Sequence, residues 1–317
     1  MPTISENCCA TPGAIDWMME GDPAIRWQVM RDLTGAPAAE VARERARVAV
    51  EGWGAYLLAM QLPDGTWPVP PPVEPRWKST LEALWLLREC GGVPSDARVR
   101  EAVERTATRF TWGEEFGDLP FFEGEVEPCI NGRVLALGAY FGHPSAQLLQ
   151  RLLSEQLADG GWNCEAPRSS TRSSFNTTLC VLEGLLAYER ALESAGAAPL
   201  PVIREARRRG EEYLLERRLF RSRRTGAVIC DEWWQLAFPN DWHYDVLWAL
   251  DYLVRAGHPL DDPRLDEALQ NLRAQRDASG RWPLGHVHER DLPFAPETEA
   301  GAPSRWVTLR ALRVLAC

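Results

Sequence analysis

The sequence lacks an apolar stretch long enough to cross a membrane, and its amino terminus lacks the charged-then-apolar pattern of a secretion signal. Its eight cysteines include no Cys-x-x-Cys pair, a distribution typical of reduced thiols rather than of a disulfide framework. These absences predict a cytoplasmic protein with no transmembrane segment.

The motifs of several enzyme classes are also missing. The chain has no glycine-rich phosphate-binding loop, no nucleophile elbow around a serine or cysteine, and no aspartate-rich magnesium motif. Positive charge is not in excess either, because the formal net charge is -10. A protein that binds nucleic acid through net charge would need the opposite sign, so we expect no nucleic-acid partner.

What the chain does have is fourteen tryptophans and three copies of one pattern, in which a helix ends in Gln and a Gly-x-Trp turn follows. Each copy joins an amphipathic helix to a more apolar one, which indicates an internal repeat. Glycine permits the tight reversal, the Gln side chain can reach the neighbouring hairpin, and the Trp ring can cover the junction. We interpret these residues as structural staples without a catalytic role. The copies are Gln61 to Trp67, Gln156 to Trp162, and Gln275 to Trp282.

Helical periodicity runs from end to end, and strand signals are close to absent. Amphipathic outer helices are predicted at 40–61, 96–109, 145–157, 201–218 and 262–275, each followed by a more apolar inner helix. The inner helices are predicted at 77–90, 129–141, 174–189, 241–256 and 304–316. An amino-terminal pair, 14–20 with 22–34, completes six hairpins. Residues 1–13, which include Cys8 and Cys9, are predicted to be a flexible leader, and 14–317 one domain.

The spacing of Gln, Gly and Trp resembles the QW repeats of squalene–hopene cyclases and the related loops of protein prenyltransferase β subunits. The resemblance covers most of the chain. It implies an all-α fold, an (α/α)6 toroid in which six helical hairpins surround a central cavity. It also implies an apolar small molecule, such as an isoprenoid, as the ligand.

In such a toroid the amino termini of the inner helices converge on one mouth of the cavity. Positive helix ends favour an anion there. The alternative is that the Ser, Asn and Asp side chains are plain helix caps, and that Arg133 and Arg305 pair with acids such as Glu127 and Asp245. The residues predicted to bind ligand are Trp77, Lys78, Cys129, Asn131, Arg133, Asn176, Arg305 and Trp306.

The predicted catalytic group is Asp241, His243 and Asp245, at the start of the inner helix 241–256. Two neighbouring carboxylates can raise the pKa of His243 or orient its ring. A cyclase needs an acid to protonate its substrate. The Asp-x-Asp-Asp acid of the squalene cyclases does not occur here, so Asp241, Asp245 or a glutamate of the cluster 123–127 would take that role.

The prenyltransferase resemblance raises zinc as an alternative to a site without metal. Those subunits carry a zinc-ligand His at an inner-helix start, where this chain has His243. Their other ligands are an Asp and a Cys two residues apart, and the corresponding stretch here, 174–178, has neither. Cys129 and Cys230 could substitute if the fold brought them close, because zinc needs three or four ligands at short range.

The function predicted from these features is that of a terpenoid cyclase-like protein. It would bind, or bind and cyclise or isomerise, an isoprenoid or another apolar molecule with a polar or anionic head. Two alternatives are a zinc-dependent prenyltransferase-like enzyme and a non-catalytic scaffold that binds a ligand or a protein. The sequence leaves the substrate, the reaction and the oligomeric state open.

Overall fold

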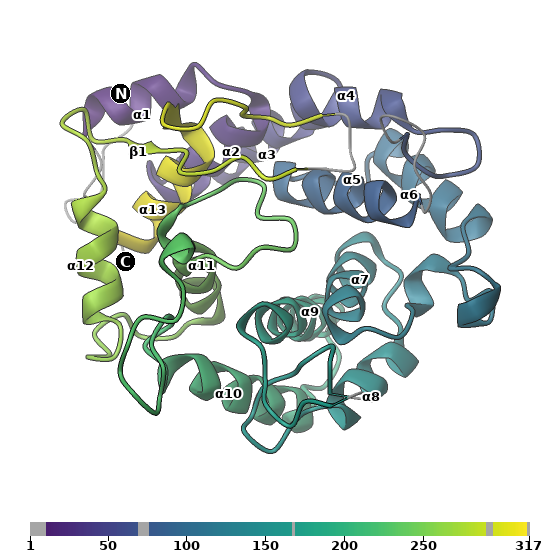
Figure 1. Cartoon of the computed structure of the whole chain (residues 1–317). Helices are drawn as coiled ribbons and strands as arrows, with labels where there is room; N and C mark the ends of the chain where they lie inside the picture. Colours follow the sequence, from purple (N-terminus) through teal and green to yellow (C-terminus); the bar gives the residue numbers. More distant parts are fainter. Residues whose placement is uncertain (1–10, 69–75, 167–168, 290–293, 316–317) are drawn as a thin grey trace. The chain divides into compact units, whose positions relative to one another are not determined.

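The computed structural model describes residues 11–68, 76–166, 169–289 and 294–315 (Figure 1). Their regular structure is helical apart from one antiparallel pair of two-residue strands, so the predicted all-α class is confirmed. None of the helices in these ranges has the length and apolar character needed to span a membrane. The α-helices and strands are α1 (Pro12–Met19), α2 (Pro23–Asp32), α3 (Ala38–Ala46), α4 (Gly52–Met60), α5 (Trp77–Cys90), α6 (Ala97–Arg109), α7 (Pro128–Phe141), α8 (Ala146–Ser154), α9 (Phe175–Ser194), α10 (Pro201–Leu215), α11 (Val246–Ala256), α12 (Asp266–Ala274), β1 (Trp282–Pro283), β2 (Pro303–Ser304) and α13 (Arg305–Leu315).

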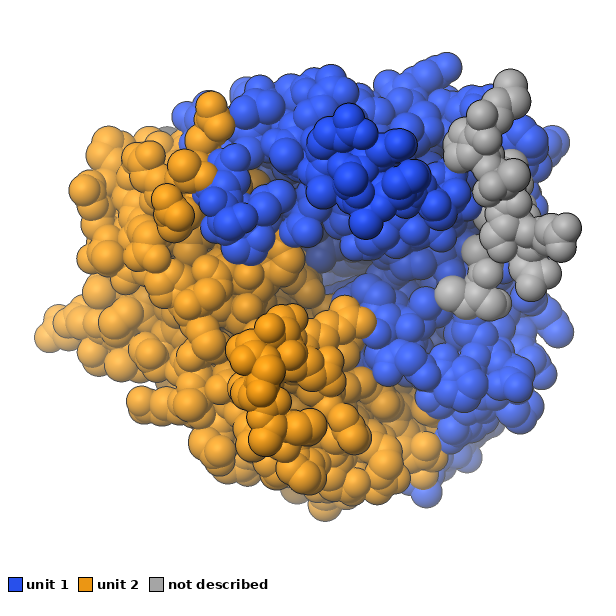
Figure 2. Space-filling model, turned by 180° about the vertical axis from the view of Figure 1, so that it is seen from behind, with its two compact units in different colours: residues 1–59, 89–96, 217–317 blue, residues 60–88, 97–216 orange. Residues whose placement is uncertain are grey.

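The chain forms two compact units, which Figure 2 shows in different colours. Unit 1 comprises Met1–Ala59, Glu89–Asp96 and Arg217–Cys317. Unit 2 comprises Met60–Arg88 and Ala97–Glu216. The joining of all six hairpins into one toroid, and into one domain, stays a prediction.

Unit 2 is built on the close packing of α7 against α9, which lie side by side in Figure 1. Two glycines let the helix backbones meet. A Cβ added to Gly132 would lie 2.5 Å from the carbonyl oxygen of Cys180, and one added to Gly184 would lie 2.4 Å from that of Gly132. Helix α8 packs on α7, and α10 packs on α9. The predicted pairing of an amphipathic helix with a more apolar one is therefore present in this unit.

Unit 1 is held together differently, by buried charges between helices. Helix α13 packs against α11 and α2. Arg313 on α13 forms ion pairs with Asp251 on α11 at 2.7 Å and with Asp32 on α2 at 2.9 Å. One turn earlier, Arg310 forms an ion pair with Glu89 at 2.8 Å. These contacts of α13 therefore carry compensated charge.

The three repeat turns have the predicted geometry. Gly65, Gly160 and Gly280 have φ angles of +86°, +99° and +86°, which an L-amino acid with a side chain rarely adopts. The tryptophans that follow them are fully buried. In the second turn the indole Nε1 of Trp162 donates a hydrogen bond to the carbonyl oxygen of Leu152 at 2.7 Å, and Trp282 does the same with Leu272.

The Gln side chains of the first two turns reach the next outer helix, as predicted. Gln61 Nε2 donates to the carbonyl oxygen of Ala102 on α6 at 2.8 Å. Gln156 Nε2 donates to that of Ala206 on α10, also at 2.8 Å. The third turn instead faces the beginning of α1, where Thr11 Oγ1 donates to the carbonyl oxygen of Ser279 at 3.3 Å. The turns are staples between hairpins.

The repeat has a further element that was not predicted from the sequence. The fourth residue of α5, α9 and α13 is a fully buried threonine in each case: Thr80, Thr178 and Thr308. Its hydroxyl oxygen accepts a hydrogen bond from the backbone N–H of the repeat tryptophan, at 3.4, 3.0 and 3.0 Å respectively. Because this Thr has the same position in all three helices, the sequence contained enough information to predict it.

Several predicted boundaries are wrong. The outer helix 40–61 is two helices, because a 3-10 turn over Arg47–Ala49 and Gly52, at φ +68°, interrupt it. The inner helix 241–256 begins only at Val246. The outer helix 262–275 begins at Asp266, and the Asp262 carboxylate accepts hydrogen bonds from the backbone N–H of Arg264 at 2.9 Å and from its guanidinium at 2.6 Å.

The predicted flexible leader is too long. Helix α1 begins at Pro12, and the hydroxyl of Thr11 caps it by accepting a hydrogen bond from the N–H of Ala14. Residues 12 and 13 are therefore helical. Residues 1–10, including Cys8 and Cys9, lie outside the described residues.

Candidate functional site

The start of α5 carries an aromatic pocket in unit 2. Trp77, predicted to bind ligand, lies 5.9 Å from Trp112 between ring centroids, and Phe110 meets Trp112 edge-on at 5.7 Å. The neighbouring Lys78 ammonium lies 5.8 Å from the Trp77 ring. The pocket has a volume of about 420 Å³ and is lined by Asp64, Thr66, Arg76, Trp77, Phe110, Thr111 and Trp112.

Phe110 and Trp112 are new to the candidate site. They follow the carboxyl end of α6, and the pattern Phe-Thr-Trp directly after an outer helix was their only signal in the sequence. Trp112 is held in place because its Nε1 donates to the carbonyl oxygen of Phe121 at 2.9 Å and its ring stacks on that of Phe121. Arg76 and Asp64 form an ion pair of 3.1 Å at the same pocket. The pocket thus combines aromatic faces with a polar edge.

The start of α7 places its predicted residues in structural roles. Asn131 is fully buried, and its amide binds the backbone N–H and carbonyl oxygen of Glu125, which fixes the preceding loop. Arg133 is also buried, with its guanidinium 4.8 Å from the Trp85 ring. Burial raises the pKa of the Cys180 thiol on α9, and the charge of Arg133 opposes that rise. Asn176 lies beside the same thiol, 4.0 Å from its sulfur.

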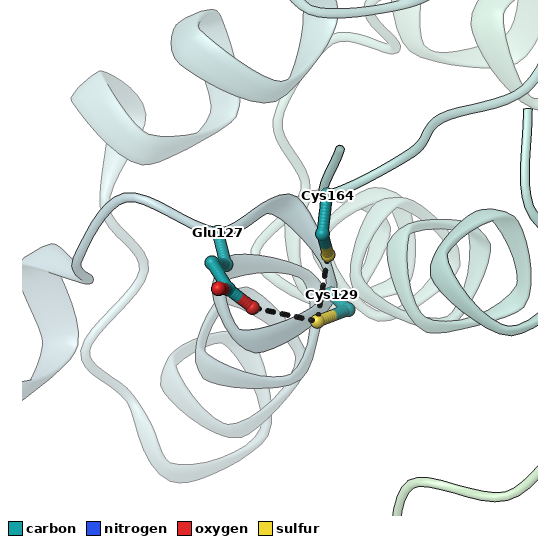
Figure 3. A group of neighbouring side chains, drawn as sticks. All are labelled: Glu127, Cys129 and Cys164. Carbon is teal, nitrogen blue, oxygen red and sulfur yellow. Dashed lines mark hydrogen bonds between the residues drawn. The ribbon is translucent and has the colours of Figure 1, made fainter. Parts of the chain in front are cut away.

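The third predicted residue of α7, Cys129, belongs to a cluster that the sequence analysis missed. Its sulfur lies 2.9 Å from that of Cys164 and 3.8 Å from a carboxylate oxygen of Glu127 (Figure 3). The hydrogen bond shared by the two thiols raises the pKa of Cys129, which keeps its proton, and lowers that of Cys164; burial raises the pKa of Cys129 further. Cys164 follows Trp162 in the loop of the second repeat turn, so a spacing of thirty-five residues hid the pair.

The start of α11 holds the three predicted catalytic residues in different environments. Asp245 is buried and caps the helix: its carboxylate accepts hydrogen bonds from the N–H groups of Trp248 at 2.7 Å and Ala237 at 3.1 Å. Burial raises its pKa. Asp241 is buried in a loop, at φ +45°. His243 is exposed, and its ring stacks on that of His288 at 3.8 Å. A catalytic role for the three stays a prediction.

The start of α13 carries its own acid. The carboxylate of Glu297, whose pKa is raised by burial, accepts a hydrogen bond from the backbone N–H of Arg305 at 2.7 Å. The Arg305 side chain reaches Trp17, donating to its carbonyl oxygen at 3.1 Å. Trp306 is buried and stacks on Phe238 at 3.9 Å. The predicted aromatic character of this helix start is present, and its first backbone N–H group already donates to a carboxyl oxygen.

A second pocket of about 580 Å³ lies at the opposite ends of two inner helices, in unit 1. It is mostly aliphatic. Its lining comes from the ends of α11 and α13, from α12 and from the loop after α11, and includes Val254, His258, Leu260, Leu269, Val314 and Leu315. The sequence analysis did not predict a site there, because it considered only the amino-terminal ends.

The predicted alternative set of zinc ligands was His243, Cys129 and Cys230. These three residues are not the ones that cluster in the structure. Among the described His, Cys, Asp and Glu residues, one group has its ligand atoms within 4.8 Å of one another: Glu127, Cys129 and Cys164. The exposed His243 stacks on His288, and the Cys230 thiol donates to Glu232 at 2.9 Å. Cys129 is the one member common to both sets. Cys90, Cys129, Cys164, Cys180 and Cys230 are free thiols.

Comparison with known proteins finds no matching family model and no matching curated protein. Among solved structures, the chain is similar to a variant of the type II terpene cyclase MstE from Scytonema with its product merosterolic acid A. The TM-score is 0.44 at 15% identity, covering 96% of this chain and 94% of that one. A protein from Actinoplanes gives 0.45 at 13% identity, covering 96% of both chains. Likeness this low assigns neither a family nor an activity.

Proposed function

We propose that the protein binds an apolar molecule of isoprenoid type, as a terpenoid cyclase-like protein would, and that the aromatic pocket at the start of α5 contacts this ligand. The observation that carries the proposal is the convergence of Trp77, Phe110 and Trp112 on a pocket of about 420 Å³. Small-molecule sites commonly have such volumes. Aromatic faces bind polyene tails through their area and also attract cations.

The polar edge of the α5 pocket supports a neutral polar head for this ligand rather than an anionic one. The Arg76 guanidinium at this edge already forms an ion pair with the Asp64 carboxylate at 3.1 Å. We therefore propose an alcohol or phenol head in place of the predicted anion.

Catalysis at the start of α11, in unit 1, is a separate proposal that does not depend on the aromatic pocket of unit 2. Asp245 caps the helix and accepts two backbone hydrogen bonds, and protonation would weaken this cap. Asp241 is buried and does not cap the helix, so it is the better acid of the pair. A cyclisation would need Asp241 to donate a proton to an alkene, with aromatic faces stabilising the cation that forms.

The binding proposal is tested with farnesol, a neutral C15 probe, and with farnesyl diphosphate, which has the same tail and an anionic head. A ligand of the folded state raises the melting temperature. We expect farnesol to raise it, and Trp77→Ala to remove most of that rise while helical content is retained. Leu260→Ala, in the aliphatic pocket of unit 1, is the control and should leave the rise unchanged.

Each remaining result would overturn part of the proposal. A response to the diphosphate alone would show that the head is anionic. Loss of the response in Leu260→Ala but not in Trp77→Ala would place the site in the aliphatic pocket. Product analysis after incubation with farnesol addresses catalysis, and an unaltered probe together with a normal rise would favour the non-catalytic scaffold.

A further inference from the structure

The strongest unassigned cluster of the molecule consists of Glu127, Cys129 and Cys164 in unit 2 (Figure 3). Its three ligand atoms all lie within 4.8 Å of one another. Cys129 is buried, and Glu127 and Cys164 are half-buried, so the group has one face toward the protein and one accessible side. None of these residues contributes to the aromatic pocket, so the cluster could act independently of ligand binding there.

The fold supports the cluster from both sides. Glu127 and Cys129 are fixed by the start of α7, where Asn131 holds the preceding loop through Glu125. Cys164 lies two residues after the anchored Trp162, and its sulfur is 3.5 Å from the hydroxyl of Thr177 on α9. The close packing of α7 on α9 therefore sets the distance between the two sulfurs.

The distances suit a tetrahedral metal centre. With Zn–S bonds of about 2.3 Å and a Zn–O bond of about 2.0 Å, tetrahedral angles separate two sulfurs by about 3.7 Å and a sulfur from an oxygen by about 3.5 Å. Cys129 and Glu127 are already 3.8 Å apart. The sulfurs, at 2.9 Å, would have to separate by about 0.8 Å, which the half-buried loop residue Cys164 can provide.

The chemistry of the donors points to the same ion. Two thiolates and a carboxylate are a set that zinc, a borderline-soft cation, binds well. When all three groups are deprotonated, their total charge is about -3. A divalent cation neutralises most of this charge, and the positive amino-terminal end of α7 stabilises the negative charge that is left. Zinc binding displaces the thiol protons, so its affinity should rise with pH.

We propose that Glu127, Cys129 and Cys164 bind one zinc ion, with a fourth position open to water. Three protein ligands and an open position are the arrangement of catalytic rather than structural zinc. This ligand set differs from that of His243, Cys129 and Cys230, which the sequence raised as an alternative.

The experiment uses the full chain, reduced with a phosphine and freed of metal by a chelator. Zn²⁺ binding is measured by equilibrium dialysis, and Co²⁺ is used as a spectroscopic substitute that reports thiolate ligands and tetrahedral geometry. We expect one ion per chain, with thiolate-to-cobalt absorption. Cys164→Ser should weaken the affinity at least tenfold, and Glu127→Gln should weaken it less.

Cys230→Ser is the matched control, because Cys230 is also half-buried and lies in unit 1. It should bind zinc like the unmodified chain. Loss of binding in Cys230→Ser with none in Cys164→Ser would overturn the site in favour of the set that the sequence suggested. If the reduced chain binds no ion and the oxidised chain carries a Cys129–Cys164 disulfide, the cluster is a redox pair and the zinc proposal is wrong.

Discussion

The inner helices of the two units meet by different physical means. In unit 2, α7 and α9 approach so closely that Gly132 and Gly184 leave no space for a Cβ. In unit 1, α13 contacts α11 and α2 through the guanidinium of Arg313 and the carboxylates of Asp251, which is buried, and Asp32. The first contact depends on shape and the second on charge. Both join helices that a single hydrophobic pattern describes equally well, so the pattern alone does not reveal how a helix pair is held.

The charged contact should be the more costly to break. Asp251→Asn removes the buried partner of Arg313 and leaves that guanidinium with one carboxylate fewer, and removing one partner of a buried ion pair costs about 3 kcal/mol or more. Denaturant unfolding measures the loss. Asp261→Asn, at an exposed aspartate near α12, is the control and should change the free energy of unfolding by less than about 0.5 kcal/mol. If both substitutions lowered the free energy of unfolding equally, the ion pair of Asp251 with Arg313 would not be a distinct source of stability in unit 1.

The close contact between α7 and α9 should be destabilised by the addition of a single methyl group. Gly184→Ala would place a Cβ 2.4 Å from the Gly132 carbonyl oxygen, and overpacking of this kind costs about 1–3 kcal/mol. Helix propensity alone would favour the alanine by about 1 kcal/mol, so the sign of the measured change decides between the two effects. Gly13→Ala in α1, where a Cβ meets open space, is the control and should stabilise the protein.

The stability of the protein at acidic pH should depend on the ionisation of Asp251. Burial raises the pKa of Asp251, but Arg313, Arg255 and Arg310 together hold it well below its ordinary value of 3.8. The unfolded chain therefore takes up a proton on this group before the folded chain does. The resulting stabilisation is complete above pH 3.8 and is lost as the pH falls further. Unfolding titrations of Asp251→Asn should have a shallower acid limb than those of the unmodified protein.

The smallest expected difference concerns the repeat turns. Gln156 in unit 2 donates to the carbonyl oxygens of Gly160 and Ala206, at 2.7 and 2.8 Å, whereas Gln275 makes no such side-chain bond to the described residues of unit 1. Gln156→Ala should therefore cost about 1 kcal/mol, and Gln275→Ala less. Thermal unfolding compares them directly. A larger loss for Gln275→Ala would mean that the third turn is stapled by contacts other than those with Thr11.

The sequence by itself determined the all-α class, the hairpin repeat and the staple turns, because these depend on local periodicity and on glycine and tryptophan at fixed spacing. The position of the buried threonine at the fourth residue of α5, α9 and α13 was equally local and could have been read. The start of α11 was misplaced because two aspartates precede its apolar run, and the second, Asp245, is the one whose carboxylate caps the helix by accepting a hydrogen bond from the N–H of Trp248. The start of α12 was placed at Asp262, four residues too early.

Only the tertiary structure decided which side chains meet. Phe110 joins Trp77 across a pocket, Cys164 joins Cys129 from thirty-five residues away, and Glu297 fills the helix end at which the sequence predicted an anionic ligand. Such contacts depend on how far two backbones approach, as Gly132 and Gly184 determine for α7 and α9. A sequence pattern records which face of a helix is apolar, but not which residue of another helix that face will touch.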